Sequence, residues 1–286
     1  MKKIVLFSII TLSLLAIFFI LIPAFSGDLV LIKSFEIGQI KIRWYGLVLA
    51  SAILTGYLIA RNHAWKFGIG EEEVDNLSFW LTIAGILGAR IYFILFDFRF
   101  FFENPSEVYK IWHGGLSIYG AIISGLIFIF IYTRRRAFTF GQIIDLLALS
   151  LPLSQALGRV GNFFNYEAFG LPTSLPWKMF VPQSFRPQGY ESFDFFHPVF
   201  LYEGMALVVV FFIVKKFLNK LPMGALGLIY LLSYSLIRFF TEFLRLDSVF
   251  ISSVKVDQAI SLGFFLLAAW ALTMLLKSQK TRHSSV

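Results

Sequence analysis

Long apolar runs, separated by short polar and mostly basic segments, form the pattern of this chain. A transmembrane helix needs about 20 consecutive, mostly apolar residues. Eight runs approach that length, although some are shorter when counted strictly: Ile4–Ile22, Trp44–Ala60, Leu77–Phe96, Leu116–Tyr132, Ile143–Leu157, Val199–Val214, Ala225–Phe243 and Ala259–Leu276. The pattern predicts an all-α fold, a polytopic integral membrane helical bundle with seven core transmembrane helices and an extra N-terminal apolar segment.

The N-terminal segment, residues 1–26, has two interpretations. Lys2 and Lys3, an apolar run and the sequence Ala24-Phe25-Ser26 resemble a signal peptide with a small-residue cleavage site. The apolar run is longer than a typical signal-peptide core, so an uncleaved membrane anchor is an equal alternative. In either case residues 27–286 form the membrane domain, and residue 27 onward begins outside the cytoplasm.

Basic residues recur between alternate pairs of apolar runs, as the positive-inside rule requires of cytoplasmic loops. The clusters are Arg61, His63 and Lys66; Arg134, Arg135 and Arg136; Lys215, Lys216 and Lys220; and Lys277, Lys280 and Arg282. Lys33, Lys41 and Arg43 blur the rule in the first external loop. The alternation predicts a multi-pass protein with a cytoplasmic C-terminus.

The longest predicted external connection runs from about residue 159 to residue 198. It contains five prolines and several aromatic residues: Pro172, Pro176, Trp177, Pro182, Phe185, Pro187, Tyr190, Phe193 and Pro198. Proline fixes the backbone and removes an amide donor, so regular structure is disfavoured here. The aromatic residues favour a small folded external cap near the lipid head groups over a disordered linker.

Composition agrees with a bilayer environment. The chain is 58% hydrophobic and 15% charged, with a mean hydropathy of +0.76 and 35 phenylalanines, which excludes a water-soluble core. The net charge of +8 lies in short clusters between apolar runs, so it indicates membrane topology and contact with anionic lipid, not nucleic acid. There is no cysteine, so any thiol in the chemistry must come from a substrate.

The most informative polar segment is Gly158–Gly170, which reads Gly-Arg-Val-Gly-Asn-Phe-Phe-Asn-Tyr-Glu-Ala-Phe-Gly and follows directly on an apolar run. It carries Arg159, Asn162, Asn165 and Glu167 at the depth where a bilayer begins. An ionised side chain at membrane depth costs about 2.5–3.5 kcal/mol on insertion scales and is usually functional. A phosphate-bearing substrate explains this cluster better than a purely structural helix.

A second arginine lies within an apolar run. Arg238 and Glu242 stand at i and i+4, with Tyr234 one turn earlier and Arg245 one turn later, so the four are expected to share a face. The plain interpretation is an intrahelical ion pair that neutralises two costly charges. The functional interpretation is an anion site, because two guanidinium groups, those of Arg159 and Arg238, can share one phosphate.

The remaining candidates lie at predicted helix ends, where interfacial anchoring is the plain alternative for each. Gly114 and Gly115 permit a tight turn or close approach of the backbone to a ligand. The side chains concerned are Tyr45, Arg90, His113, Tyr119, His197, Tyr202 and Glu203. No zinc-protease, P-loop or serine-nucleophile motif occurs in the sequence, and we expect neither a metal site nor a cofactor.

With these motifs in this order, the chain resembles the prolipoprotein diacylglyceryl transferases of bacterial membranes. The resemblance extends from Arg43 to Leu276. The most specific element is Gly-Arg-x-Gly-Asn-Phe-x-Asn-x-Glu-x-x-Gly at Gly158–Gly170. Supporting motifs are Arg43-Trp44-Tyr45-Gly46, Gly88-x-Arg90, Gly114-Gly115-x-Ser117-x-x-Gly120, His197-Pro198-x-x-x-Tyr202-Glu203 and Arg238-x-x-x-Glu242-x-x-Arg245.

The resemblance implies a phosphatidylglycerol–prolipoprotein diacylglyceryl transferase. Such an enzyme moves the diacylglyceryl group from phosphatidylglycerol to the lipobox cysteine thiol in the signal peptide of a preprolipoprotein, forming a thioether and releasing glycerol phosphate. It further implies a bacterial cytoplasmic (inner) membrane location with the active site toward the outer leaflet, where Arg159 and Arg238 stabilise the leaving phosphate. The implied substrate-binding residues are Tyr45, Arg90, Asn162, Asn165, Glu167, Gly170, His197, Tyr202, Glu203, Tyr234 and Arg245.

One position departs from the family pattern. The family commonly has histidine, a proposed catalytic base, where this chain has Tyr119. A tyrosine accepts a thiol proton only if its pKa is much lowered, so His113 and Glu242 are alternative bases. Two other functions fit the same residues: a secondary transporter of an anionic solute, and a catalytically inactive relative that binds lipid.

Overall fold

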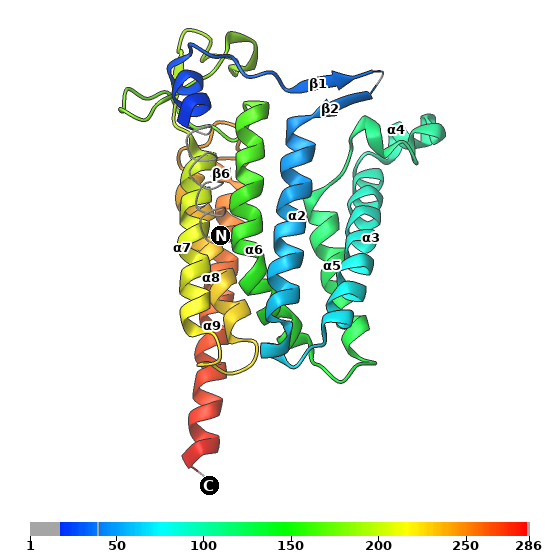
Figure 1. The fold of residues 1–286 in the computed structure, drawn as a ribbon. Helices are drawn as coiled ribbons and strands as arrows, with labels where there is room; N and C mark the ends of the chain where they lie inside the picture. Colours follow the sequence, from blue (N-terminus) through cyan, green and yellow to red (C-terminus); the bar gives the residue numbers. More distant parts are fainter. Residues whose placement is uncertain (1–17, 39, 285–286) are drawn as a thin grey trace, which may run out of the picture. The chain divides into compact units, whose positions relative to one another are not determined.

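The computed structural model describes residues 18–38 and 40–284 (Figure 1). Residues 18–26 are helical. The long helices that follow are α2 (Trp44–His63), α3 (Glu71–Phe96), α5 (Ile118–Thr133), α6 (Phe140–Asn165), α7 (Val199–Phe217), α8 (Ala225–Thr241) and α9 (Val256–Ser284). Short elements connect them: α4 (Phe98–Glu103) and the 3-10 turns η1 (Ala64–Phe67), η2 (Pro105–Glu107), η3 (Ile111–His113) and η4 (Gln183–Phe185).

Each predicted apolar run after residue 27 forms a helix, which confirms a mostly helical polytopic membrane protein. In the part of the chain that the structure describes, four helices are long and apolar enough to cross a bilayer: Trp44–Phe67, Glu71–Phe96, Phe140–Asn165 and Val256–Gln279. The helices Ile118–Thr133 and Ala225–Thr241 are apolar but shorter. The prediction for residues 1–17 of the N-terminal segment concerns residues outside the described part of the chain.

The fold is not purely helical. Three antiparallel two-stranded ladders occur among the described residues: β1 (Ser34–Ile37) with β2 (Ile40–Arg43), β3 (Met179–Phe180) with β4 (Phe195–Phe196), and β5 (Phe250–Ile251) with β6 (Val254–Lys255). Ser34 pairs with Arg43 in the first ladder, Met179 with Phe196 in the second and Phe250 with Lys255 in the third. The segment predicted as a cap therefore holds a small ladder, although its prolines had indicated irregular backbone.

Two helix ends differ from the sequence prediction. Helix α6 runs to Asn165 instead of ending near Leu157, so Arg159 and Asn162 lie on its last turns. Polar side chains end the apolar run, but the backbone ladder continues through them because a helix needs only its own amide and carbonyl groups. Helix α8 ends at Thr241. Glu242 lies in the turn that follows, and its amide donates to the carbonyl of Arg238 (3.0 Å).

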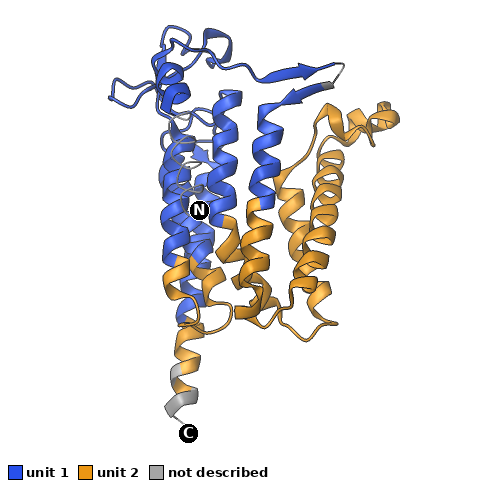
Figure 2. Ribbon diagram, in the orientation of Figure 1, with its two compact units in different colours: residues 1–54, 152–213, 230–273 blue, residues 55–151, 214–229, 274–286 orange. Residues whose placement is uncertain are grey.

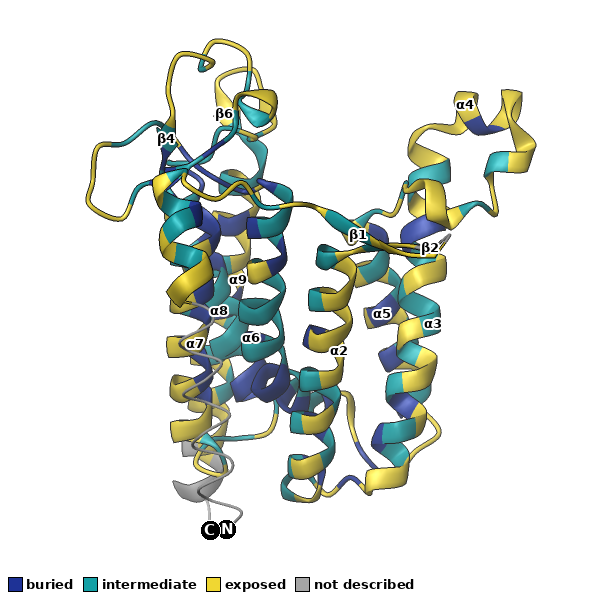
Figure 3. Ribbon diagram, turned by 45° about the horizontal axis from the view of Figure 1, so that its top comes forward, coloured by how far each residue is buried: buried dark blue, intermediate teal, exposed yellow. Residues whose placement is uncertain are grey.

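The chain divides into two compact units (Figure 2). Unit 1 comprises residues 1–54, 152–213 and 230–273, and unit 2 comprises residues 55–151, 214–229 and 274–286. Many large apolar side chains on the helices are exposed, as along α2 and α3 (Figure 3). Exposed apolar side chains on long helices are expected where the solvent is lipid.

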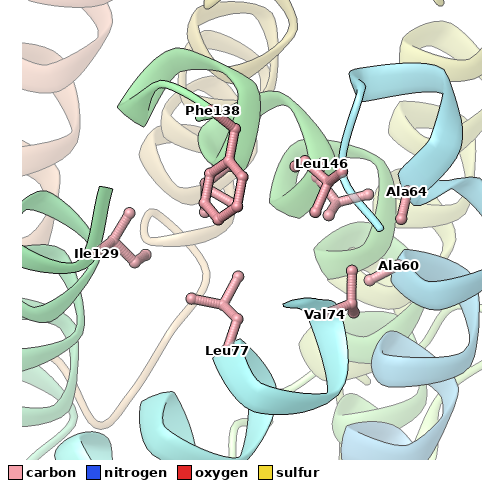
Figure 4. Packing of buried hydrophobic residues seen from close by; sticks show 9 residues of the cluster. Ala60, Ala64, Val74, Leu77, Ile129, Phe138 and Leu146 are labelled. Carbon is pink, nitrogen blue, oxygen red and sulfur yellow. The ribbon is translucent and has the colours of Figure 1, made fainter. Parts of the chain in front are cut away.

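Unit 2 has an apolar core near the ends of its helices. Buried residues from α2, α3, α5, α6 and the turns between them form this core, including Ala60, Ala64, Val74, Leu77, Ile129, Phe138 and Leu146 (Figure 4). On α6, the buried Asp145 carboxylate accepts the amide of Gly224 (2.7 Å) and that of Gly227 (2.8 Å). It thereby satisfies amide donors at the N-terminus of α8 that the helix cannot satisfy itself.

Helices α3 and α5 cross at small residues. A Cβ on Gly88 of α3 would lie 2.8 Å from the carbonyl oxygen of Gly120 on α5, and closer still to the side chain of Ser124. The Ser124 hydroxyl donates to the carbonyl of Ala84 (2.9 Å) across the same crossing. Glycine and serine let the two backbones approach closely, which is how membrane helices pack without a hydrophobic driving force.

Unit 1 has its own core, formed by α6, α7, the loop after α6 and the N-terminal helix. Ala24, Phe163, Phe169, Met179, Phe196 and Phe200 are among its buried members. The ring of Phe25 lies 5.6 Å from that of Phe163, and the amide of Leu31 donates to the Tyr166 hydroxyl (2.8 Å). The described part of the N-terminal segment is therefore packed into unit 1.

The α3–α5 crossing predicts opposite effects for two neighbouring glycines. Gly88→Ala should destabilise the protein by about 1–3 kcal/mol, the usual cost of overpacking. Gly85→Ala has nothing within 4 Å of the added Cβ and should stabilise by about 0.5–1 kcal/mol through helix propensity. The free energy of unfolding in mixed micelles measures both, and equal effects of the two substitutions would contradict the close crossing.

Candidate active site

Three arginines of unit 1 meet at Glu203, near the beginning of α7. Its side chain is 1% exposed. Arg159 of α6 places Nη2 2.5 Å from Oε2 of Glu203, and Arg238 of α8 donates through Nη1 to Oε1 (2.8 Å). The hydroxyl of Thr241 also donates to Oε1 (3.1 Å). Two guanidinium groups that are 79 positions apart in the sequence thus converge on one carboxylate.

The two oxygens of this carboxylate are not equivalent. Oε1 accepts well-aligned hydrogen bonds, whereas Oε2 contacts Arg159 without the alignment of a hydrogen bond and has no hydrogen-bond donor among the described residues. The Arg159 contact is therefore a close ion pair of poor hydrogen-bond geometry. The Arg159 guanidinium therefore keeps N–H groups that can donate hydrogen bonds to a second anion.

Arg238 is shared among acidic groups from three other positions. Besides Glu203, its Nη2 donates to Glu242 Oε2 (3.0 Å) and to Asp257 Oδ2 (2.6 Å) at the start of α9. The predicted pair of Arg238 and Glu242 is thus one part of a larger network. Because Asp257 comes from another helix, the network connects α7, α8 and α9.

Arg245 lies in the turn after α8 and not on the helix, so the sequence expectation of a shared helical face with Tyr234 and Arg238 is wrong for this residue. Its Nη1 lies 3.6 Å from Glu203 Oε1, and its Nε donates to Asp247 (2.8 Å). Burial of the Asp247 carboxyl opposes ionisation, but the hydrogen bond and charge of Arg245 outweigh it and lower the pKa of Asp247.

The formal charges of this cluster cancel. Lys255 donates to the carbonyls of Glu242 (2.5 Å) and Arg245 (3.2 Å). It adds a fourth basic group, after Arg159, Arg238 and Arg245, to the four carboxylates of Glu203, Glu242, Asp247 and Asp257. Balanced charge explains how so many ionisable groups lie together in an apolar protein, since a buried charge persists only when paired.

The Gly158–Gly170 signature connects to the same place through its backbone. The amide of Gly170 donates to the carbonyl of His197 (2.8 Å), and Gly170 bridges to Arg245. A Cβ on Gly170 would lie 2.6 Å from Val199 Cγ2 and 2.7 Å from the carbonyl of Leu244. The glycine thus permits close approach of two protein segments, and it fixes the loop after α6 against the end of α8.

The other signature residues have more modest contacts. The amide of Glu167 donates to the carbonyl of Asn162 (3.0 Å), and Asn165 Nδ2 donates to the exposed carboxylate of Glu167 (3.3 Å). Tyr45, near the start of α2, lies against Gly161, where a Cβ would come within 2.8 Å of the ring. The small residue at 161 therefore leaves space for the Tyr45 ring beside the last turns of α6.

Three aromatic or imidazole groups form a hydrogen-bonded chain at the start of α7. Trp177 Nε1 donates to the Tyr202 hydroxyl (2.8 Å), and His197 Nδ1 lies 3.1 Å from the same hydroxyl. Burial lowers the pKa of His197, which favours the neutral imidazole. On α8, the ring of Tyr234 stacks on that of Tyr230 with centroids 6.0 Å apart.

The remaining predicted residues, Arg90, His113 and Tyr119, belong to unit 2. Arg90 is buried and donates to the carbonyls of Val108 (2.9 Å), Gly114 (2.6 Å), Gly115 (3.0 Å) and Glu107. Its guanidinium therefore shapes the loop of residues 105–117 through the backbone. These carbonyls accept from most of its N–H donors, and a substrate-binding role for Arg90 stays a prediction.

His113 and Tyr119 lie in and after this loop. His113 Nδ1 is 2.7 Å from Glu107 Oε2, and Lys110 Nζ donates to Oε1 of the same carboxylate (2.7 Å). These hydrogen bonds, Lys110 first, lower the pKa of Glu107. Gly114 and Gly115 both have positive φ, as the predicted tight turn requires. The Tyr119 ring, 46% exposed, lies 6.4 Å from that of Tyr92.

Sequence reasoning missed four members of the network around Glu203, namely Thr241, Asp247, Lys255 and Asp257, and named Trp177 only as an aromatic residue of the cap. The signal for Asp257 was present, since it is an acidic residue in the first turn of an apolar helix. Thr241 ends α8, and Asp247 and Lys255 lie between α8 and α9, where no helical periodicity indicates which residues they contact.

Comparison with known proteins places this chain in a family. A family model described as prolipoprotein diacylglyceryl transferase matches residues 33–274. The chain belongs to that family. The phosphatidylglycerol–prolipoprotein diacylglyceryl transferase of Fervidobacterium nodosum is 44% identical, over 98% of each chain.

Other members of the prolipoprotein diacylglyceryl transferase family are similarly close. The enzyme of that name from Thermotoga maritima is 42% identical, over 99% of this chain and 100% of its own. The one from Synechococcus elongatus is 41% identical, over 79% of this chain and 81% of its own. The residues of the network around Glu203 thus lie within the range matched by the family model, residues 33–274.

The pair of Arg245 and Asp247 predicts a pH-dependent contribution to stability. Because the folded state lowers the pKa of Asp247 below its ordinary value of 3.8, the pair stabilises the protein at neutral pH. That contribution is lost as the pH falls below this value. Asp247→Asn should therefore lower the unfolding midpoint at pH 7, and the difference from the unsubstituted protein should shrink as the pH falls below 3.8.

The control is Asp97→Asn, which removes an exposed carboxylate after α3 and should change the midpoint little at neutral or acidic pH. A difference between Asp247→Asn and the unsubstituted protein that does not shrink as the pH falls below 3.8 would contradict the ion pair.

Proposed function

We propose that this chain transfers the diacylglyceryl group of phosphatidylglycerol to the lipobox cysteine thiol of a preprolipoprotein, in the first step of lipoprotein maturation. The observation that carries the proposal is the convergence of Arg159 and Arg238 on one buried carboxylate. A position bounded by two guanidinium groups suits one phosphate, since each planar fork offers parallel N–H donors.

The charge that develops in the reaction explains why two arginines are needed. The substrate sulfur attacks the terminal glyceryl carbon, the bond from that carbon to the phosphate oxygen breaks, and the thiol proton passes to a base. A phosphodiester with one negative charge becomes a phosphate monoester that carries about two at neutral pH. Donors preorganised for the second charge lower the barrier in a low-dielectric site.

Glu203 gives this clamp a resting state. Its carboxylate holds the two arginines in place before substrate binds, and the balanced charges keep the cluster stable. The lipid phosphate accepts hydrogen bonds from guanidinium N–H groups that form no aligned hydrogen bond with Glu203, above all those of Arg159. Glu242 and Asp257 retain Arg238 during this exchange, so the guanidinium remains oriented.

The other predicted residues have supporting roles in this proposal. Tyr45, Asn162, Asn165, Glu167 and Tyr234 orient the glycerol head group or the arginines, and His197 with Tyr202 offers hydrogen bonds beside the start of α7. Arg90 acts through the loop that it shapes. The base is one of Tyr119, His113 and Glu242, of which His113 has a carboxylate partner, Glu107.

The membrane arrangement follows from the same proposal. Seven core helices span the bacterial cytoplasmic membrane, with the C-terminus in the cytoplasm and the cap, from the signature to about residue 198, outside. Phosphatidylglycerol and the signal peptide both reach the site from the surrounding membrane lipid. An active site toward the outer leaflet agrees with a lipoprotein substrate that is modified after its lipobox leaves the cytoplasm.

Loss of either guanidinium should abolish most of the activity. Removing one donor to a transition-state oxyanion typically costs roughly 10²–10³-fold in kcat, and Arg159→Ala and Arg238→Ala should each lose at least that much. The measurement is lipidation of a lipobox peptide by the purified protein, with phosphatidylglycerol in detergent. Full turnover in both variants would exclude the phosphate clamp.

Two controls separate chemistry from folding. Arg99→Ala removes an arginine whose side chain is 93% exposed and should keep full activity. The paired variant Arg159→Gln/Glu203→Gln removes one charge of each sign, so it avoids the stability loss of an unpaired buried carboxylate. It should fold normally and remain inactive.

A separate comparison identifies the base. Tyr119→Phe, Tyr119→His and His113→Gln each change one candidate, and the rate of peptide lipidation as a function of pH reports the titrating group. If tyrosine is the base, Tyr119→Phe is inactive and Tyr119→His is active with its acid limb at lower pH. An unchanged profile in Tyr119→Phe assigns the proton to another group. Binding of phosphatidylglycerol without turnover in the unsubstituted protein would instead identify a lipid-binding relative.

A further inference from the structure

The N-terminal helix of residues 18–26 lies outside the range matched by the family model, which begins at residue 33. It is nonetheless part of the folded unit 1. Ala24 is 1% exposed, and Gly27 lies so close to the ring of Phe180 that a Cβ there would come within 2.9 Å of it. A segment with a fully buried residue is a structural component of the unit, not only a leader.

This helix forms one wall of a cavity of about 500 Å³. Leu21, Ile22 and Phe25 of this helix line the cavity together with Trp177, Phe195 and Leu201. The volume falls in the range of about 300–1,000 Å³ that small-molecule sites usually have. A mostly apolar cavity open to the surroundings of a membrane protein suits a hydrocarbon chain, because such a chain gives up no hydrogen bonds when it leaves water.

One cation stands at the cavity. Lys178 is among its lining residues, and its Nζ lies 4.0 Å over the ring of Phe195. Within the described residues no carboxylate forms an ion pair with Lys178, unlike the arginines of the network around Glu203. A lysine without an acidic partner beside an apolar cavity complements an amphiphile with an anionic head group.

The cavity is separate from the arginine cluster. Leu201 lines the cavity and Glu203 binds the arginines, and two positions along an α-helix turn a side chain by about 200°. The two sites therefore lie on different sides of α7. The hydrogen bond from Trp177 to Tyr202 connects the cavity wall to the residue between them.

We propose that this cavity binds an acyl chain of an anionic phospholipid, whose phosphate pairs with Lys178, and that the N-terminal helix is retained in the folded protein to form the site. The site is additional to the one at Arg159 and Arg238. It requires no turnover, so it stands even if the proposed transfer reaction does not.

The test uses full-length protein in bilayer nanodiscs that contain phosphatidylglycerol with a photoactivatable group on one acyl chain. After illumination, peptide mass spectrometry maps the labelled residues. We expect labelling concentrated at residues 21–26, 176–178 and 201. Lys178→Glu should reduce it at least about fivefold, the factor that corresponds to roughly 1 kcal/mol for one basic residue beside anionic lipid.

Matched variants keep the test specific. Lys41→Glu reverses another cation of unit 1, on β2, and should leave labelling unchanged, whereas Ile22→Trp should fill the cavity and reduce labelling at residue 201. A phosphatidylcholine analogue should label these residues about fivefold less. Equal labelling by both lipids, equal labelling in Lys178→Glu, or a mature chain that lacks residues 18–26 would each overturn the proposal.

Discussion

The carboxylate of Glu203, held between two guanidinium groups, is the interaction on which the site depends. Each charge alone would be costly in an apolar bundle, because desolvation of an ion amounts to several kcal/mol even after relaxation. Together they fix the last turns of α6, the first turn of α7 and the end of α8 at one point. The same pairing that makes the charges tolerable brings the two arginines together.

Further contacts around the Glu203 cluster connect the segments that carry it. Gly170 fastens the loop after α6 to the residues after α8, while Asp257 and Lys255 bring in the start of α9. The cluster carries equal numbers of acidic and basic groups, so it is stable without a ligand, and in the proposed function the lipid phosphate takes up guanidinium donors beside Glu203. A site that binds a phosphate reversibly needs both properties, since an uncompensated pair of arginines would disfavour the empty fold.

Much of the fold was predictable from the sequence, because lipid as solvent makes the apolar run the dominant signal for a membrane helix. The positions at which the helices end were less predictable. Helix α6 continues through Arg159 and Asn162, since their polar side chains find protein partners or the surface while the backbone ladder stays intact. Arg238 and Glu242 were paired by spacing alone, and they do contact each other.

The site was only partly predictable. The sequence singled out Arg159, Arg238 and Glu203, but Glu203 was interpreted as a residue near a helix start, because nothing in local spacing reveals a partner 35 or 44 positions away. Asp247 and Lys255 were missed because they lie in the connection between α8 and α9, and Asp257, although visible as an acidic residue at the start of α9, was not connected with Arg238, 19 positions away. Arg90 shows the opposite case: its motif was recognised, and only the structure showed that its donors are used on the backbone of its own unit.

The central claim is that Arg159 and Arg238 act on the same phosphate, and a double-mutant cycle on kcat/KM for peptide lipidation tests it most directly. Residues that share one interaction show non-additive losses. The account predicts that Arg159→Ala/Arg238→Ala is little worse than the more damaging single variant, with a coupling free energy above about 1.4 kcal/mol, the equivalent of tenfold. Losses that multiply independently, in variants that remain folded, would contradict it.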